Sequence, residues 1–281
     1  MNQDAGRGGH LVIPLHLEGG VELPFLVDTG APIAVLDKSL ASQLGQCLGT
    51  DSLWNFGAKY EASRYAAPRL YLGNTPLITD SNTLASDFIG KLSARLGRPV
   101  MGILGMDCLQ HYCVQLDFRA GKMRFLDPNR LKTAKLGQAF PMELSSNGQG
   151  DPQWYRLFIR QSNLAGGEET DLLVDTGCSD DGLLKPGPFR RELEEQRWRM
   201  PVDAAPDPEP NVVDLPECVW NGATYTNLWL GNGSAAVERG SGESSLGLRF
   251  LARHLVTFDF PKQTMYLKQT SIGPLGLDEP R

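Results

Sequence analysis

The chain has 281 residues, of which 41% are hydrophobic and 21% are charged, and a formal net charge of -6. This length is sufficient for two lobes with a sizeable core, and the composition is ordinary for a globular protein. The acidic balance, with Lys and Arg scattered along the chain, excludes the basic footprint of a nucleic-acid-binding protein. No apolar run approaches the roughly 20 residues of a membrane-spanning helix, so we expect no membrane span.

The start of the chain, MNQDAGRGG, has neither the basic nor the apolar region of a signal peptide. We therefore expect a soluble protein that stays in the cytoplasm, unless a leader segment was removed from it. The five cysteines have no framework spacing, and their odd number favours reduced and buried thiols. Their spacing does not suit a zinc site, which needs four ligands in recognisable pairs. We expect no metal and no other cofactor.

The first part of the chain predicts β structure that delivers an aspartate. Residues 10–17 and 21–27 read as strands around Gly19-Gly20, so we expect a hairpin that leads to Asp28. Asp37 can then cap a short helix over residues 38–44. The elements expected after it are helices over residues 87–96 and 106–112 and a hairpin of residues 113–118 and 123–126.

The second part begins after a bridge over residues 132–138 and repeats this order of elements. We expect strands around residues 140–144, 154–160 and 171–174, the last of which leads into Asp175, and then a helix over residues 189–198. Residues 200–216 carry five prolines. We therefore expect a loop there, without a regular hairpin.

The tripeptide Asp-Thr-Gly occurs twice, and each copy follows an apolar run that ends in Leu-Val. A repeat that extends beyond one motif indicates duplication of a whole structural unit. The landmarks that recur in the same order are Asp-Thr-Gly at 28–30 and 175–177, Leu-aromatic-Leu-Gly-Asn at 70–74 and 228–232, Leu-Gly at 104–105 and 246–247, and Asp-Phe at 117–118 and 259–260. We interpret the chain as a tandem duplication with lobes at residues 1–134 and 135–281.

Each half resembles the lobe of the aspartic peptidases, and specifically the retropepsin-like lobe. The resemblance lies in the apolar pair before Asp-Thr-Gly, the later apolar-apolar-Gly element, the short helix after it and the closing hairpin. Ala31 and residues 103–109 are more similar to retropepsin-like bacterial proteins than to pepsin. The resemblance implies a mainly β fold of two pseudo-symmetric β-barrel lobes with a few short helices. Because one chain carries both lobes, it also implies a monomer.

The resemblance further implies an aspartic endopeptidase that hydrolyses peptide bonds in extended polypeptides. Two carboxyl groups that share one proton can activate a water and protonate the leaving amine. Two charges about 3 Å apart repel by roughly 5 kcal/mol at an effective dielectric near 20, so both carboxyls are not ionised together. The carboxyls would be those of Asp28 and Asp175. The supporting residues would be Thr29 and Thr176, with hydroxyls bonded across the lobes, and Gly30 and Gly177, which leave room for the peptide.

A flap hairpin between the first acid and the Leu-Gly element belongs to the same resemblance. Phe56, Gly57 and Ala58 are the candidate tip, where the flap would contact substrate. An ordinary surface hairpin is the alternative for this segment.

The main alternative to an enzyme is a catalytically inactive, protease-like module that binds peptides. Cys178 stands where the family usually has Ala, Ser or Thr, and Ser245 replaces an apolar residue. The retroviral pattern also pairs an Asp with an Arg next to the active site, and we expect this pair to be missing in both halves. The positions concerned are Pro32, Ser179, Met106 and Leu248.

Three other interpretations have weaker support. The two tripeptides could be simple turns at strand ends. Cys178 could be a nucleophile, but no histidine lies in a motif that identifies a base, and His111 and His254 are expected on helix surfaces. Asp180-Asp181 with Asp175 could suggest a magnesium site, but a solvated acidic turn explains them better.

Overall fold

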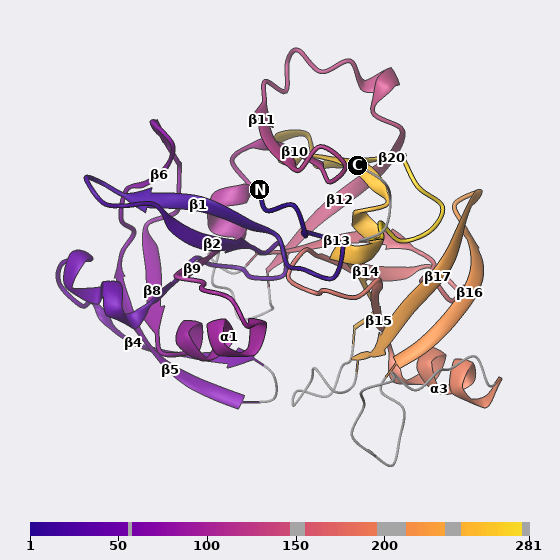
Figure 1. The fold of residues 1–281 in the computed structure, drawn as a ribbon, viewed down its shortest axis with the longest axis horizontal. Coiled ribbons are helices and arrows are strands. Elements are labelled where there is room, and N and C mark those ends of the chain that lie inside the picture. Colours follow the sequence, from indigo (N-terminus) through magenta and orange to yellow (C-terminus); the bar gives the residue numbers. More distant parts are fainter. Residues whose placement is uncertain (56–57, 147–154, 196–211, 234–242, 277–281) are drawn as a thin grey trace.

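The computed structural model describes residues 1–55, 58–146, 155–195, 212–233 and 243–276. The protein is mainly β, with two lobes and a few short helices, as the sequence predicts (Figure 1). Its strands form one sheet of nine strands and one of eleven. Within the described residues, no helix has both the length and the apolar character that crossing a membrane requires.

Among the described residues, the first half supplies eleven strands. Its strands are β1 (Val12–Leu17), β2 (Leu23–Val27), β3 (Val35–Asp37), β4 (Gly49–Asn55), β5 (Ala58–Ala66), β6 (Leu70–Leu72), β7 (Thr75–Pro76), β8 (Asn82–Ser86), β9 (Gly102–Leu104), β10 (Cys113–Asp117) and β11 (Lys122–Leu126). Its helices are the 3₁₀ helix η1 (Lys38–Gln43), α1 (Phe88–Leu96) and α2 (Met106–Leu109).

The second half begins with the 3₁₀ helix η2 (Thr133–Lys135), inside the segment expected as a bridge. Its strands are β12 (Gln138–Ser146), β13 (Tyr155–Gln161), β14 (Thr170–Asp175), β15 (Gly182–Leu184), β16 (Val212–Trp220), β17 (Ala223–Asn232), β18 (Ser245–Gly247), β19 (His254–Asp259) and β20 (Thr264–Gln269). Its other helices are α3 (Pro186–Glu194), α4 (Leu248–Leu251) and η4 (Phe260–Lys262).

The two halves repeat one strand order. In the first, β2, β9, β3, β8 and β5 lie side by side, and in the second β14, β18, β15, β17 and β16 follow in the same sequence. The pairings also match, because β2 with β9 and β14 with β18 are parallel, as are β3 with β8 and β15 with β17. The duplication inferred from the sequence is therefore a structural one.

One of the repeated sequence landmarks does not occupy equivalent places in the two halves. Residues 70–74 include β6, which pairs with β1, whereas residues 228–232 lie in β17 and run parallel to β15. The structural counterpart of this part of β17 is β8, which runs parallel to β3. The shared Leu-aromatic-Leu-Gly-Asn string is thus a coincidence of composition, since apolar alternation followed by Gly-Asn suits many strand ends.

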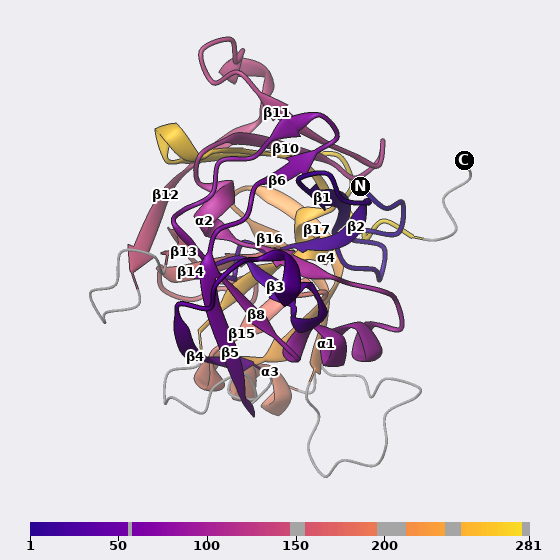
Figure 2. The same cartoon turned by 90° about the vertical axis from the view of Figure 1, so that its left-hand side faces the viewer.

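A set of antiparallel strands joins the two halves. Strand β10 pairs with β11 on one side and with β19 on the other, and β20 and β12 continue the sheet. Figures 1 and 2 show β10 and β11 above the lobes. Since β10 and β19 come from different halves of the chain, this sheet fixes how the lobes face one another. The boundary at residues 134 and 135 stays a prediction.

Several local expectations are confirmed. The Asp37 carboxylate caps η1 by accepting a hydrogen bond from the Ser39 N–H, at 2.9 Å. Helix α1 ends at Gly97, whose φ of 61° is left-handed and therefore suits a residue without Cβ. Helix α3 begins three residues earlier than expected, with Pro186 at its first turn, where a missing N–H costs nothing.

The expectations for residues 212–216 and for His254 are wrong. Residues 212–216, expected in a loop, belong to β16, which forms a long hairpin with β17 around Asn221-Gly222. The rest of that proline-rich run lies outside the described residues. His254, expected on a helix surface, is buried at the start of β19 and hydrogen-bonds to the Tyr225 hydroxyl at 2.9 Å. Burial lowers the pKa of His254 to about 4, so its imidazole is neutral near pH 7.

Candidate active site

Equivalent strands deliver the two aspartates to the boundary between the halves. Asp28 follows β2, whose Phe25 and Val27 are buried, and Asp175 ends β14, whose Leu172 and Val174 are buried. These apolar side chains anchor both strands in the core. The acids therefore extend from rigid supports.

The threonines of the two motifs join the loops through reciprocal hydrogen bonds. The Thr29 hydroxyl donates to the Val174 carbonyl at 2.6 Å and accepts from the Thr176 N–H at 3.0 Å. The Thr176 hydroxyl donates to the Val27 carbonyl at 2.8 Å and accepts from the Thr29 N–H at 3.0 Å. Both side chains are buried. Because every donor and acceptor is used, these bonds fix the two loops in register.

The two acids meet across this junction. A Cβ built on Gly30 would lie 2.6 Å from Oδ1 of Asp175, and one built on Gly177 would lie 2.5 Å from Oδ2 of Asp28. Each carboxyl group therefore packs against the glycine of the opposite loop, in a space that any other residue would fill. The two carboxyls are close enough for the charge of Asp175 to raise the pKa of Asp28.

The local hydrogen bonds to the two acids are nearly identical. Oδ1 of Asp28 accepts from the N–H groups of Gly30 at 2.8 Å and Ala31 at 3.2 Å. Oδ1 of Asp175 accepts from Gly177 at 2.9 Å and Cys178 at 3.1 Å. One oxygen of each carboxyl is thus held by two backbone donors, which orient the carboxyl group.

Enclosure by protein raises the pKa of both acids, although each side chain keeps part of its surface exposed. The pKa of Asp28 is raised to about 8, first by burial and then by the neighbouring charge of Asp175. The pKa of Asp175 is raised by burial. A pair with one protonated and one ionised member is the arrangement that such a site stabilises near neutral pH.

A glycine under each loop allows the close packing that holds it. A Cβ on Gly105 would lie 2.8 Å from the Ala31 carbonyl oxygen, and one on Gly247 would overlap the Asp180 carbonyl oxygen. The helix that follows each glycine donates to the loop, through Met106 to the Ala31 carbonyl and through Leu248 to the Cys178 carbonyl.

The second loop is braced by a buried ion cluster that sequence reasoning missed. The Asp181 carboxylate, expected in a solvated turn, is fully buried and binds Arg249 at 2.5 Å and Arg253 at 2.8 Å. It also accepts from the Trp229 N–H at 2.8 Å. The expectation that neither half has an Asp–Arg brace is therefore wrong for the second half. The retroviral pattern places its acid at the position of Ser179. Here the acid lies two residues later, at Asp181, so the usual spacing gave no signal.

The first half has a buried acid where the second has an arginine. Asp107 follows Gly105 by two residues, as Arg249 follows Gly247, and it is fully buried. Neither oxygen of its carboxyl group makes a hydrogen bond of normal geometry in the part of the chain that the structure describes. Burial raises the pKa of Asp107 to about 7, so the carboxyl is protonated in mildly acidic solution.

This acid is expected to make stability fall as the pH rises. The unfolded chain releases the Asp107 proton near the ordinary pKa of 3.8, whereas the folded protein keeps it up to about pH 7. The stability that the protonated carboxyl contributes to the folded protein is therefore lost between these two pH values. Asp107→Asn should reduce the difference between the urea midpoints at pH 4.5 and pH 7. Asp117→Asn, which changes a half-buried acid paired with Arg124, is the control, and an unchanged difference in Asp107→Asn would refute the effect.

The candidate flap is only partly described. Strands β4 and β5 form a hairpin whose last pair is Asn55 with Ala58, so Ala58 is the first residue of β5. Phe56 and Gly57, the rest of the candidate tip, lie outside the described residues. Their contact with substrate stays a prediction.

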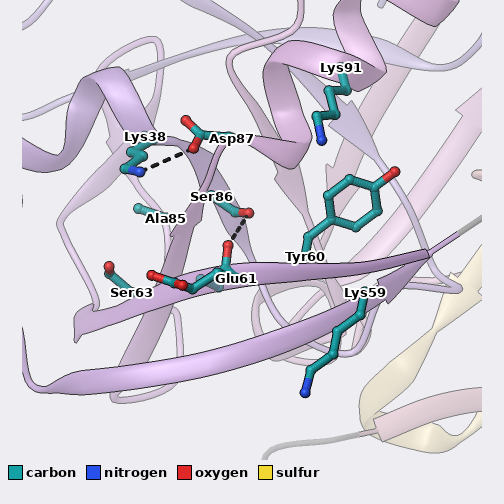
Figure 3. A pocket seen from close by; sticks show the side chains of 10 residues that line it. Lys38, Lys59, Tyr60, Glu61, Ser63, Ala85, Ser86, Asp87 and Lys91 are labelled. Atoms are coloured by element: carbon teal, nitrogen blue, oxygen red, sulfur yellow. Dashed lines mark hydrogen bonds and ion pairs between the residues drawn. The ribbon is translucent and has the colours of Figure 1, made fainter.

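A polar cavity of about 240 Å³ lies beside this hairpin, between β5, β8, η1 and the start of α1 (Figure 3). Lys38 pairs with Asp87 across it at 3.1 Å, and Lys91 lies 4.8 Å from the Tyr60 ring centroid. Neither Asp28 nor Asp175 lines it. The cavity is thus separate from the paired carboxyls.

Cys178 lies next to the second acid but is not set up as a nucleophile. Burial, and then the charge of Asp175, raises the pKa of its thiol well above the usual value. A cysteine nucleophile needs a depressed pKa or an adjacent base, and this environment acts in the opposite direction.

No family model matches the sequence, and no curated protein matches it. Among solved structures, the chain is similar to basic 7S globulin from soybean, with a TM-score of 0.60 and 14% sequence identity. The similarity covers 96% of this chain and 94% of that chain. At this identity the likeness shows the fold alone, and its coverage shows that both lobes share it. The chain therefore has the two-lobed, pepsin-like fold.

Proposed function

We propose that this protein is a monomeric aspartic endopeptidase that cleaves extended polypeptides through Asp28 and Asp175. The observation that carries the proposal is the meeting of the two Asp-Thr-Gly loops, where each carboxyl packs against the opposite glycine. The threonine hydroxyls hold that junction, and Gly30 and Gly177 leave it open to a peptide. No metal, covalent intermediate or other cofactor is needed for this chemistry.

In the proposed reaction, a water lies between the two carboxyls. The ionised member accepts a proton as the water attacks the peptide carbonyl, and the protonated member donates to the carbonyl oxygen. The preorganised backbone donors at Oδ1 of each acid keep the carboxyls oriented throughout. General acid–base catalysis of this kind contributes about 10² to 10⁴-fold to a rate.

The pH optimum of cleavage is expected to lie nearer neutral pH than the optimum of pepsin does. Activity requires one ionised and one protonated acid, so it rises as Asp175 ionises above the ordinary value of 3.8 and falls as Asp28 ionises near 8. Ala31 and Cys178 also offer no hydroxyl that would stabilise the carboxylates and lower these pKa values. A peptide-library digest across pH 3 to 9 tests both the activity and its optimum. A maximum below pH 4 would contradict this prediction.

The second candidate is an inactive, protease-like module that binds peptides without cleaving them. It is favoured by Cys178 and Ser245, which depart from the family pattern, and by the name of the similar structure, which is that of a globulin and not of an enzyme. The same digest separates the two functions. Binding of a library peptide that is recovered intact at every pH would favour the module.

A further inference from the structure

The residues that lie opposite the two acids differ in charge between the halves. In the antiparallel pair β13–β14, Phe158 faces Leu173, and the same register two residues further on sets Arg156 beside Asp175. In β1–β2, Val12 faces Leu26, and the register carried two residues further sets His10 beside Asp28. His10 and Arg156 thus occupy matched positions in the duplicated fold.

Arg156 supplies a fixed positive charge on the side of Asp175. Its guanidinium binds both carboxylate oxygens of Glu243, one of them at 3.0 Å, and lies 5.4 Å from the Phe158 ring centroid. Only 30% of its side chain is exposed, so the charge is held in place and solvent screens it incompletely. The charge of Arg156 acts to lower the pKa of Asp175, against the larger opposing effect of burial and in addition to the hydrogen bonds from Gly177, Asp28 and Cys178, which lower it more.

His10 supplies no comparable charge to Asp28. Burial, and then the charges of Arg98 and Arg95, lower the pKa of its imidazole. The ring is therefore neutral near pH 7. After burial, the groups that act most on the pKa of Asp28 are Asp175 and the backbone N–H groups of Gly30 and Ala31.

Other charged groups lie around the pair. On the first side, Arg98 and Arg95 act on His10, and Arg98 is paired with Asp4 at 3.0 Å. Behind the first loop is the buried acid Asp107, and behind the second is Arg249, with Arg253 and Asp181. The charge of Arg249 acts on Asp180, and the Cys178 thiol, on which the charges of both acids act, stays protonated because its pKa is raised. Glu243 neutralises part of the charge of Arg156, and the remaining charge still acts on Asp175.

We infer that the shared proton of the pair resides on Asp28 and the negative charge on Asp175, with Arg156 as the positioning residue that sets this asymmetry. The inference rests on the proposed peptidase function. Asp175 is then the base that accepts a proton from water as the water oxygen bonds to the carbonyl carbon. Asp28 donates its proton to the carbonyl oxygen, so the pair still holds one proton, now on Asp175.

The second half of the reaction restores the starting state. As the carbon–nitrogen bond breaks, the leaving nitrogen takes the proton from Asp175, and one hydroxyl of the tetrahedral intermediate returns its proton to Asp28. The products are a carboxylic acid and an amine, and the roles of the two acids are ready for the next cycle.

The test is the pH dependence of kcat/KM for a cleaved library peptide in paired variants. Arg156→Gln removes the cation, so the acidic limb, which reports the ionisation of Asp175, should move up by about half a pH unit. Glu243→Gln leaves Arg156 unneutralised, so the same limb should move down. The basic limb, which reports Asp28, should stay in place in both variants, and Arg156→Lys should keep the acidic limb of the parent.

Arg160→Gln is the matched control, because Arg160 lies on the same strand and pairs with the exposed Asp171 at 3.3 Å. Movement of the basic limb in Arg156→Gln would assign the proton to Asp175 and overturn the inference, as would two unmoved limbs in folded variants. A parent protein that cleaves no peptide would instead refute the proposed function.

Discussion

Asp28→Asn and Asp175→Asn are each expected to lower kcat for peptide cleavage by about 10³-fold or more, since either change removes one of the two proton-transfer groups. Neither change should unfold the protein. Asparagine has nearly the same shape and keeps an oxygen that can accept the backbone N–H bonds of Gly30 or Gly177. It also removes a titratable group that its surroundings make costly to ionise.

The measurement is a peptide digest followed by mass spectrometry, with thermal unfolding of each variant as the test of folding. Asp117→Asn is the control and should cleave at the parental rate, because Asp117 lies at the end of β10 and pairs with Arg124 of β11. Folded Asn variants that cleave as fast as the parent would refute the assignment of the two acids.

Asp181→Asn is expected to cause the largest loss of stability, about 3 to 5 kcal/mol, because it leaves the guanidinium of Arg253 buried without its counter-charge. Arg253 keeps hydrogen bonds to the carbonyl oxygens of Thr226 and Ile272, but carbonyl dipoles do not replace a carboxylate. The Asp175 loop, which this cluster ties to α4, should loosen as well.

The free energy of unfolding in urea measures this effect. Asp171→Asn is the matched control, since it breaks an exposed ion pair with Arg160 that solvent already screens. Equal losses in the two variants would show that the buried cluster does not brace the second half.

The fold was predictable because the duplicated motif constrains it strongly. Asp-Thr-Gly after an apolar strand marks a loop that only glycine can close against the opposite acid, and two copies in one chain require a partner for each. Helix boundaries followed from local chemistry, as at Asp37 and Gly97, where the cap lies within a few residues of the helix.

The errors arose where distant residues decide the structure. The prolines of residues 200–216 masked β16, although Asn221-Gly222 between two apolar runs is a strong hairpin signal. Asp181 reads as a surface acid because its arginines lie about 70 positions further along the chain, with |i−j| of 68 and 72. His254 was assigned from its neighbours in sequence, whereas its burial depends on Tyr225 of another strand.

The charge difference between Arg156 and His10 was beyond the reach of the sequence for a similar reason. Only the strand register sets these two residues opposite the acids. Without it, Arg156 is one of many scattered basic residues, and His10 belongs to the polar start of the first strand.

The central claim is that Asp28 and Asp175 together hold one reacting water, and a crystal structure with a pepstatin-like transition-state mimic tests it most directly. We predict that the central hydroxyl of the bound mimic lies about 2.5 to 3.0 Å from an oxygen of each carboxyl. A mimic bound elsewhere, or carboxyls too far apart to share one hydroxyl, would contradict the account.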